Sequence, residues 1–396
     1  MKISKQILPI IIAAVFVSGC ASMRHAVPED RIVEAQTFGM RDIRAFSGIP
    51  SDIFKKDFLA LLEQEKKTDS LASFMNTRTY SMLAISGGAA NGAYGAGLLS
   101  GWSISETRPS FQTVTGISTG AIIAPFAFLG SKYDDVLKEF YTKYSTDDIM
   151  RLRFPFVNSF ASTRPLERII ERYCDAKVLK EIAIEYRKGR RLYVGTTNLD
   201  AQRLVIWDMG KIASVGDEKA LRLFHKVILA SASVPVAFPP VYFKVQVGDK
   251  EYDEMHVDGG ITRQVFFLYD VLQGFDKAVK EDGLDLNRNK YQIYVIRNGY
   301  VEPRYKEVPD KIISIAERAM DTMTNAQGVG DLYQLYVFTK NGKRGDFNLA
   351  YIPASYISQA KEFFDPAEMK KLYELGFNEA VKGYAWRKAP PGVSDN

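Results

Sequence analysis

The feature that most constrains the fold is an alternation of short apolar strands, glycine-rich loops and helices that begins at Tyr80. The stretch YSMLAI predicts a buried strand, and AYGAGLLSGW predicts a helix that follows a glycine-rich loop. The pattern then repeats, with FQTVT as a strand, a loop around Ser118 and AIIAPFAFLG as an apolar helix. Strands that alternate with helices favour a largely parallel sheet with helices on both faces.

The rest of the chain continues this alternation. Further strands are expected at residues 191–198, 203–209, 241–247, 253–258 and 291–298. Helices are expected at residues 51–67, 164–173, 217–232, 310–325 and 366–386, the last capped by Asp365.

The N-terminus has the layout of an export signal. MKISKQ is a short positive segment, and ILPIIIAAVFV is apolar but too short to span a bilayer comfortably. The following VSGC resembles the lipobox of bacterial lipoproteins, in which Cys20 would be lipidated and become the new N-terminus. A plain secretory signal cleaved nearby is the alternative. Ala21, rather than Asp, after the cysteine favours the outer membrane by the same resemblance.

Composition excludes some partners. The formal net charge is +5, and Lys and Arg are interspersed with Asp and Glu, so the sequence shows no nucleic-acid footprint. The chain has two cysteines. If Cys20 carries lipid, Cys174 has no disulfide partner and is expected to be an inert, partly buried side chain.

The loop around Ser118 fits the pattern G-x-S-x-G, with Gly116 and Gly120 on either side. This is the pattern of a nucleophile elbow, a tight strand-to-helix turn whose glycines let strand and helix approach closely. The helix after the serine would direct its N-terminus at the site, which favours developing negative charge. An ordinary serine in a loop of small residues is the alternative.

A nucleophilic serine needs a base, and the chain offers three histidines, His25, His225 and His256. They do not match the order of a serine hydrolase with a late histidine. Asp258, in HVDGG at a strand end, is the better candidate, because burial can raise the pKa of a carboxyl group enough for it to act as a base. A turn at the Asp-Gly pair is the alternative.

The stretch SGGAANGAYGAG, residues 86–97, lies between a strand and a helix. Glycine-rich loops at helix N-termini gather backbone N–H groups around an anion. It is no Walker A loop, because Gly92 is not followed by Lys, and it lacks the last glycine of the dinucleotide fingerprint. An oxyanion hole remains, together with close helix packing through Ala93, Gly97 and Gly101.

In order and spacing, LAISGGAANGAYGAGLL, GISTGA and HVDGG resemble the motifs of the patatin-like phospholipase family, over residues 80–270. The resemblance implies a three-layer α/β/α fold with a mixed, mostly parallel sheet. It implies a Ser-Asp dyad without histidine, with Ser118 as the nucleophile and Asp258 as the general base. The implied oxyanion loop consists of Gly87, Gly88, Ala89, Asn91 and Gly92.

After Asp258 the family often has Asn and Pro, whereas the run ITRQVFF here has Gln264 and Phe266. Two positions of the glycine-rich loop also depart from the family pattern. Ala89 replaces the third glycine of the loop and can donate its N–H if its φ is negative. Asn91 replaces an Arg or Lys, which removes a positive charge near the oxyanion, unless its side chain shapes the loop through hydrogen bonds.

The resemblance divides the chain into five parts. Residues 1–19 are the signal peptide, 20–78 a tether and helical lead-in, 79–300 the catalytic domain, 301–386 a helical extension packed on it, and 387–396 a disordered tail.

The expected activity is hydrolysis of acyl esters of phospholipids or lysophospholipids through an acyl-enzyme, with no metal or organic cofactor. The expected partners are membrane lipid and the bilayer that holds Cys20, and no oligomeric state is assigned. A catalytically inactive lipid-anchored scaffold and an acyltransferase with the same dyad are the alternatives. The apolar segment 152–161 would line an acyl site or belong to the core.

Overall fold

The computed structural model describes residues 24–59, 79–152, 159, 161–268, 290–341 and 345–393. The predicted signal peptide, Cys20 and most of the segment 152–161 lie outside the described residues.

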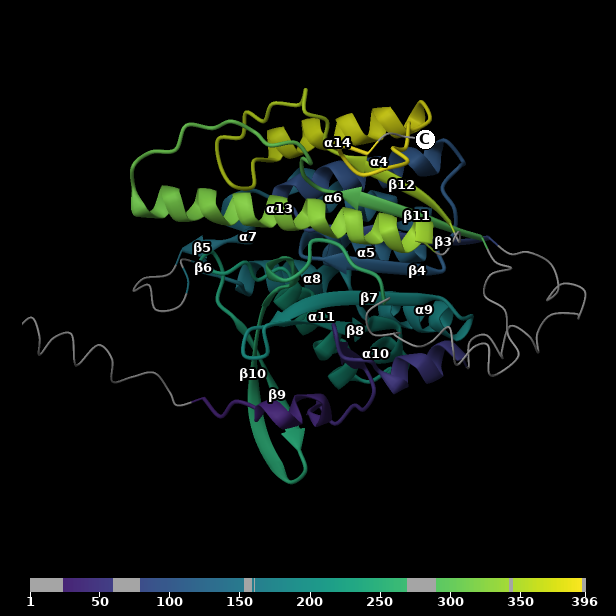
Figure 1. The fold of residues 1–396 in the computed structure, drawn as a ribbon, viewed down its shortest axis with the longest axis vertical. Helices are drawn as coiled ribbons and strands as arrows, with labels where there is room; N and C mark the ends of the chain where they lie inside the picture. The colour runs from purple at the N-terminus through teal and green to yellow at the C-terminus, as the bar shows by residue number, and fades with distance from the viewer. Residues whose placement is uncertain are drawn as a thin grey trace, which may run out of the picture.

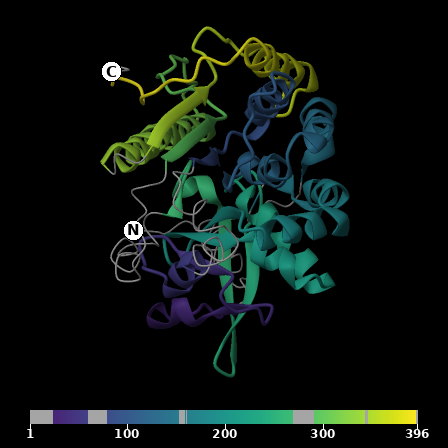
Figure 2. The same cartoon turned by 90° about the vertical axis from the view of Figure 1, so that its right-hand side faces the viewer.

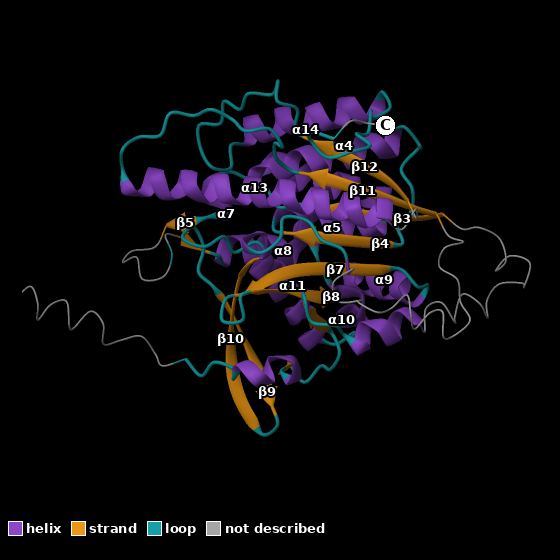
Figure 3. Cartoon of the chain, viewed as in Figure 1, coloured by secondary structure: helices purple, strands orange, loops and turns teal. Residues whose placement is uncertain are grey.

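A ten-stranded mixed sheet forms the middle layer of the described fold (Figures 1 and 3). Five neighbouring strands are parallel, in the spatial order β12 (Gly345–Tyr351), β11 (Lys290–Arg297), β3 (Thr79–Ile85), β4 (Thr113–Ile117) and β7 (Arg191–Asn198), with β12 at the edge of the sheet. The remaining strands are antiparallel to their neighbours: β8 (Arg203–Asp208) and β2 (Arg44–Phe46), then β10 (Lys250–Asp258), β9 (Val241–Val247) and β1 (Gln36–Thr37).

Helices cover both faces of this sheet (Figure 2). One face carries α4 (Gly92–Ile104), α5 (Thr119–Leu129), α6 (Asp134–Lys143), α8 (Arg164–Tyr173), α9 (Ala176–Arg187), α10 (Met209–Val215), α11 (Glu218–Ser231) and α14 (Pro366–Val381). The other face carries α13 (Ile312–Asn341) and a helix over residues 52–59. The predicted three-layer α/β/α fold is therefore confirmed.

Short elements connect these layers. They are η1 (Glu29–Glu34), η2 (Ala89–Asn91), η3 (Ser131–Tyr133), η4 (Gly259–Ile261), α7 (Thr146–Ile149) and the two-stranded ribbon of β5 (Arg151–Leu152) and β6 (Ala161–Ser162).

The described part of the N-terminal segment is built into the domain, although the sequence suggested a tether and lead-in. Strand β1 pairs with β9, and β2 pairs with β8, which makes both part of the central sheet. Ile43, Phe46 and Phe54 are buried. Figure 1 shows this purple segment beside the hairpin of β9 and β10. Residues 24–59 thus contribute to the same core as the strands that follow.

The C-terminal segment differs from the predicted helical extension because it adds a strand to the sheet. Strand β12 pairs in parallel with β11, and its Asp346 and Asn348 are poor strand formers that hid it in the sequence. The predicted helix at 310–325 is longer, since α13 runs to Asn341. Part of the segment predicted as a disordered tail packs on the domain. Arg387 forms an isolated antiparallel β-bridge with Leu349, and Ala389 is buried.

Helix α14 begins at the predicted cap, where the Asp365 carboxylate accepts from the N–H groups of Ala367 and Glu368. It packs against α4 through glycines. A Cβ at Gly97 would lie 2.0 Å from the carbonyl oxygen of Tyr373, and one at Gly101 would lie 2.2 Å from that of Phe377. The predicted role of these two glycines in helix packing is confirmed.

We expect Gly97→Ala to lower the free energy of unfolding by about 1–3 kcal/mol, because the new methyl group forces the two helices apart. Gly330→Ala is the matched control, since a Cβ at this position of α13 meets nothing within 4 Å. It should stabilise the protein by about 0.5–1 kcal/mol through helix propensity. Urea unfolding of both variants measures the effects, and equal shifts would contradict the packing argument.

Candidate active site

Strand β7 brings the two predicted catalytic residues together. Strand β4 pairs in parallel with the first half of β7 and ends with Ile117 opposite Gly195. Strand β10 pairs antiparallel with the second half and ends with Asp258 opposite Thr196. Both ends therefore meet head-on at adjacent residues of β7, and Ser118 and Asp258 lie at the junction.

Ser118 lies on a strained turn between β4 and α5. Its φ and ψ are 55° and −123°, a conformation that is uncommon for a residue with a side chain. A Cβ at Gly116 would lie 2.3 Å from the carbonyl oxygen of Gly120, and one at Gly120 would lie 2.2 Å from that of Ile85. Both glycines therefore allow the close approach that a tight strand-to-helix turn requires.

Ser231, on α11, holds this turn in place through two hydrogen bonds. Its hydroxyl accepts a hydrogen bond from the Ser118 backbone N–H at 2.9 Å and donates one to the carbonyl of Gly195 at 2.6 Å. The elbow is thus tied to β7 at the junction. Sequence reasoning missed Ser231, although it lies in the stretch ILASAS before a proline-rich loop.

Asp258 is buried, and its two carboxylate oxygens differ. Oδ1 accepts from the backbone N–H of Gly260 at 2.7 Å. Oδ2 is buried and has no conventional hydrogen-bond partner in the described part of the chain. Burial raises the pKa of Asp258 to about 7, while the nearby Ser118 hydroxyl and the Gly260 N–H oppose the shift. An aspartate in this state can exchange a proton near neutral pH.

The predicted oxyanion loop lies directly against Ser118. A Cβ at Gly87 would lie 3.1 Å from the Ser118 Cβ, and one at Gly88 would lie 2.0 Å from the carbonyl oxygen of Asn298. A Cβ at Gly92 would lie 2.2 Å from Oγ1 of Thr119. Within the described residues, the N–H groups of Gly87 and Gly88 donate no hydrogen bond, so both are available to an anion.

The two departures of the loop from the family pattern behave differently from what the sequence suggested. Ala89 has a φ of +49°, in the left-handed region, so the condition under which its N–H would serve as a donor is not met. This conformation costs about 1–2 kcal/mol for alanine, which explains why glycine suits the position. Asn91 has an ordinary right-handed conformation, and its side chain makes no hydrogen bond within the described residues. No contact there supports a loop-shaping role for its amide.

An apolar pocket opens beside Ser118. Its walls come from α5, α6, α7, α8, the loop after α11 and the segment that leads into α14. The lining side chains besides Ser118 are Ala89, Thr119, Ile122, Phe140, Tyr141, Ile149, Leu166, Ala232, Val234, Ala237, Phe238, Phe363, Phe364 and Met369. This set was missed, because its members are scattered over nearly 300 residues of the chain.

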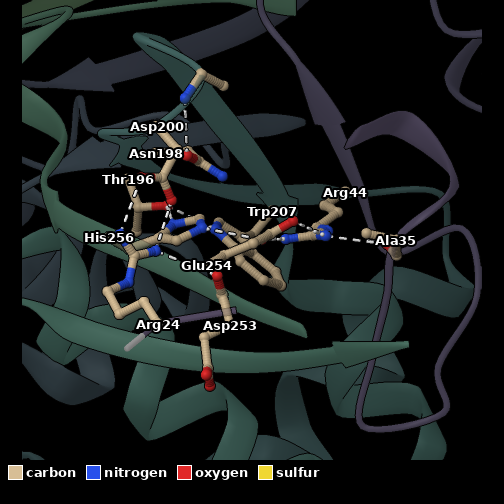
Figure 4. Close-up of polar contacts among 11 residues, drawn as sticks. Arg24, Ala35, Arg44, Thr196, Asn198, Asp200, Trp207, Asp253, Glu254 and His256 are labelled. Atoms are coloured by element: carbon tan, nitrogen blue, oxygen red, sulfur yellow. Dashed lines mark hydrogen bonds and ion pairs between the residues drawn. The ribbon is translucent and has the colours of Figure 1, made fainter. Parts of the chain in front are cut away.

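His256 is hydrogen-bonded away from Ser118, although it shares a strand face with Asp258. Its Nε2 faces the Glu254 carboxylate at 3.1 Å, and its Nδ1 lies 2.8 Å from the Thr196 hydroxyl (Figure 4). A carboxylate only accepts, so Nε2 carries the proton and Nδ1 accepts from Thr196. Burial lowers the pKa of His256, which keeps the ring neutral. Arg44 neutralises Glu254 through bonds of 2.5 and 2.9 Å.

The other two histidines are also engaged elsewhere. Nε2 of His225 lies 2.6 Å from the carbonyl oxygen of Cys174, and the His25 ring packs on Tyr252. Cys174 is buried, and burial raises the pKa of its thiol to about 12, as expected for an inert cysteine.

The described residues show neither a candidate metal site nor a candidate membrane-spanning helix. No cluster of three or more His, Cys, Asp or Glu side chains there could hold a metal ion. No described helix is both long and apolar enough to cross a membrane.

A three-layer α/β fold with a serine at such an elbow, beside an apolar pocket, is typical of serine hydrolases that act on acyl groups. Residues 83–270, just under half of the chain, match the family described as patatin-like phospholipase. The predicted resemblance is confirmed. Among solved structures, VipD from Legionella pneumophila is similar at 12% identity and a TM-score of 0.33, over 77% of this chain and 67% of that chain. No curated protein matches the sequence.

The raised pKa of Asp258 predicts a cost in stability. A carboxyl group that titrates near 3.9 in the unfolded chain and at about 7 in the fold lowers stability progressively as the pH rises between these values. Asp258→Asn removes this cost. We expect it to raise the free energy of unfolding by about 2–4 kcal/mol at pH 8, and far less at pH 4. Urea unfolding at both pH values tests this, and an equal change at both would refute a protonated Asp258.

Proposed function

We propose that the protein hydrolyses acyl ester bonds of phospholipids or lysophospholipids, with Ser118 as the nucleophile and Asp258 as the general base. One observation carries the proposal. Among the described residues, the junction on β7 sets a buried carboxylate oxygen with no conventional hydrogen-bond partner next to a serine at the mouth of an apolar pocket. Burial of an acceptor without a partner is costly, which argues for a use in catalysis.

In the first step, Oγ of Ser118 attacks the ester carbonyl while its proton passes to Oδ2 of Asp258. The tetrahedral intermediate then expels the alcohol of the lipid, which takes the proton from Asp258. Water repeats the sequence on the acyl-enzyme and releases the fatty acid. The pKa of about 7 suits this alternation between base and acid.

The oxyanion of each tetrahedral intermediate would be held by the N–H groups of Gly87 and Gly88, which are unpaired among the described residues. These donors are rigid, because the backbone of the loop is fixed against β11 and α5. The N-terminus of α5 adds a favourable dipole at the same place. Asn91 contributes no charge here, so the loop itself stabilises the oxyanion through its backbone N–H groups.

The pocket supports an acyl chain as the group transferred. Its lining is almost entirely aliphatic and aromatic, and Phe363 at its rim is 54% exposed. An apolar chain would gain about 0.8 kcal/mol per buried methylene there. The same acyl-enzyme would also allow transfer to an alcohol, and analysis of the products separates hydrolysis from this alternative.

We expect Ser118→Ala to abolish esterase activity on a soluble p-nitrophenyl ester and Asp258→Asn to lower kcat by about 10²-fold or more. In the wild type, kcat/KM should rise with pH through about 7, because Asp258 must be ionised to accept the proton. Steady-state rates across pH 5–9 and labelling with a fluorophosphonate probe provide the measurement.

His256→Gln is the control for the base. It keeps hydrogen bonds to the neighbours of His256 and should retain most activity per folded molecule. A loss equal to that of Ser118→Ala, with circular dichroism unchanged, would make the dyad the wrong mechanism. A wild-type protein that the probe does not label at Ser118 would favour an inactive scaffold.

We further propose that the protein is exported and anchored by an acylated Cys20, in the outer membrane. The support comes from VSGC and from Arg24. Arg24 pairs with Asp200 at 2.6 Å, so a residue only four positions after Cys20 is held on the folded domain. Four residues span at most about 14 Å, which would hold the domain against the bilayer that contains its substrate.

Mass spectrometry of the membrane fraction should find residues 1–19 removed and two or three acyl chains on Cys20. Two or more chains hold a protein on a membrane stably, whereas one holds it marginally. Cys20→Ala should shift the protein out of the membrane fraction. Equal membrane retention of this variant would rule out the anchor without affecting the enzymatic proposal.

A further inference from the structure

Arg297, at the end of β11, is a buried charge that forms no ion pair with the described carboxylates. Its side chain is nearly inaccessible, with 7% of the residue exposed. Nη1 donates to Oε1 of Gln264 at 2.8 Å and lies 3.4 Å from Oγ of Ser86. Arginine is almost never this buried without a carboxylate partner, because desolvation of the charge is costly.

On one side, Arg297 reaches the loop that holds Asp258. Gln264, which accepts from Arg297, donates through Nε2 to the carbonyl oxygen of Gly260 at 2.8 Å. The N–H of Gly260 donates in turn to Oδ1 of Asp258 at 2.7 Å. Arg297 therefore fixes the orientation of the carboxyl group through the Gln264 side chain and the backbone of Gly260.

On the other side, Arg297 and its neighbour Asn298 hold the oxyanion loop. The Ser86 hydroxyl donates to the carbonyl of Gly87 at 2.7 Å and accepts from the N–H of Asn298 at 2.8 Å. The Asn298 side chain donates to the Ser86 carbonyl and accepts from the N–H of Gly95, both at 3.0 Å. The end of β11 thus anchors both ends of the turn that carries Gly87 and Gly88.

The neighbouring residues of α13 leave room for the Arg297 guanidinium and do not form an ion pair with it. A Cβ at Gly328 of α13 would lie only 3.1 Å from the Arg297 Cζ, so the glycine leaves room for the guanidinium. Asp331, also on α13, is the carboxylate whose charge Arg297 feels, but it accepts from the N–H of Gln264 at 2.6 Å and pairs with Arg263 at 3.0 Å. Arg263 offsets much of the Asp331 charge, and Arg297 forms no direct ion pair with a described carboxylate.

We propose that Arg297 is a positioning residue that aligns the oxyanion loop with the Asp258 carboxyl group and places a positive charge behind both. The proposal rests on the proposed function. It gives the site a cation at the end of β11, whereas position 91, where the family pattern has a basic residue, carries Asn91.

The charged groups around Asp258 make the effect testable by pH. Arg297 acts from β11, Asp331 and Arg263 offset each other, and His256 is neutral beside the Arg44–Glu254 pair on β10 and β2. From β7 and α11, the nearest side chains are uncharged threonines and serines. Loss of Arg297 should therefore raise the pKa of Asp258 further, because the positive charge that favours the ionised carboxylate is removed.

The experiment compares Arg297→Met, which removes the charge and the donors, with Arg297→Lys, which keeps the charge. We expect Arg297→Met to lower kcat by about tenfold to a hundredfold with KM changed less than about twofold. The pH midpoint on the acidic side of the kcat/KM profile should rise by about half to one pH unit. Arg297→Lys should leave this pH midpoint in place and lose less in kcat.

Arg108→Met is the matched control, because Arg108 is equally buried but pairs with Asp134 between α4 and α6. It should lower the thermal midpoint and leave the acidic side of the kcat/KM pH profile unchanged. The proposal would be overturned if Arg297→Met left the acidic side of the kcat/KM pH profile unchanged and lowered kcat only in proportion to the amount of folded protein. If Arg297→Met does not fold, Gln264→Leu cuts the connection to Gly260, and an unchanged kcat in that variant overturns it.

The two proposals fail in different ways. If wild-type protein is not labelled by fluorophosphonate and Ser118→Ala turns over the ester as the wild type does, the proposed function is wrong. If both behave as expected and only the Arg297 variants do not, the role of Arg297 is wrong.

Discussion

The site depends on one shared edge of β7. Two strands of opposite direction, β4 and β10, hydrogen-bond to successive halves of this edge and meet between Gly195 and Thr196. Because β10 occupies the next position on β7, β4 cannot continue, and the chain must turn away at Ser118. The same arrangement ends β10 at Asp258. The strained elbow and its proximity to the carboxyl group therefore have one cause, which is the competition of two strands for a single edge.

That arrangement costs free energy through backbone strain and burial of a carboxyl group, and hydrogen bonds from neighbouring elements offset this cost. Ser118 and Ala89 adopt positive φ values that residues with side chains avoid. Asp258 is held in an environment that favours its protonated form. Against these costs stand the hydroxyl bridge of Ser231 and the contacts that Arg297 makes to both loops. A site whose donors and acceptors are fixed in advance needs no reorganisation when charge develops, which is the usual reason for such a cost.

The sequence predicted the layers of the fold and both ends of the junction, because strand periodicity, G-x-S-x-G and D-G-G are local patterns. It could not predict the pocket or Arg297, since these depend on which distant segments the topology brings together. The N-terminal strands β1 and β2 were missed for a related reason. They are only two and three residues long, and they form because β9 and β8 offer them edges. Arg44 completes that docking by pairing with Glu254, a contact that spans 210 positions.

Hydrogen-bond satisfaction separates the structural polar groups of the core from those left available for chemistry. His256 and Asp258 lie two residues apart on the same strand, and both are buried. Every polar atom of the His256 ring has a partner, and such a ring stabilises one packing arrangement. Asp258 keeps one oxygen without a conventional partner, and the N–H groups of Gly87 and Gly88 are likewise unpaired among the described residues. One acceptor and two donors left open beside one serine are what acyl transfer requires. The histidine nearest in sequence to the aspartate is therefore structural, because its bonding capacity is already used.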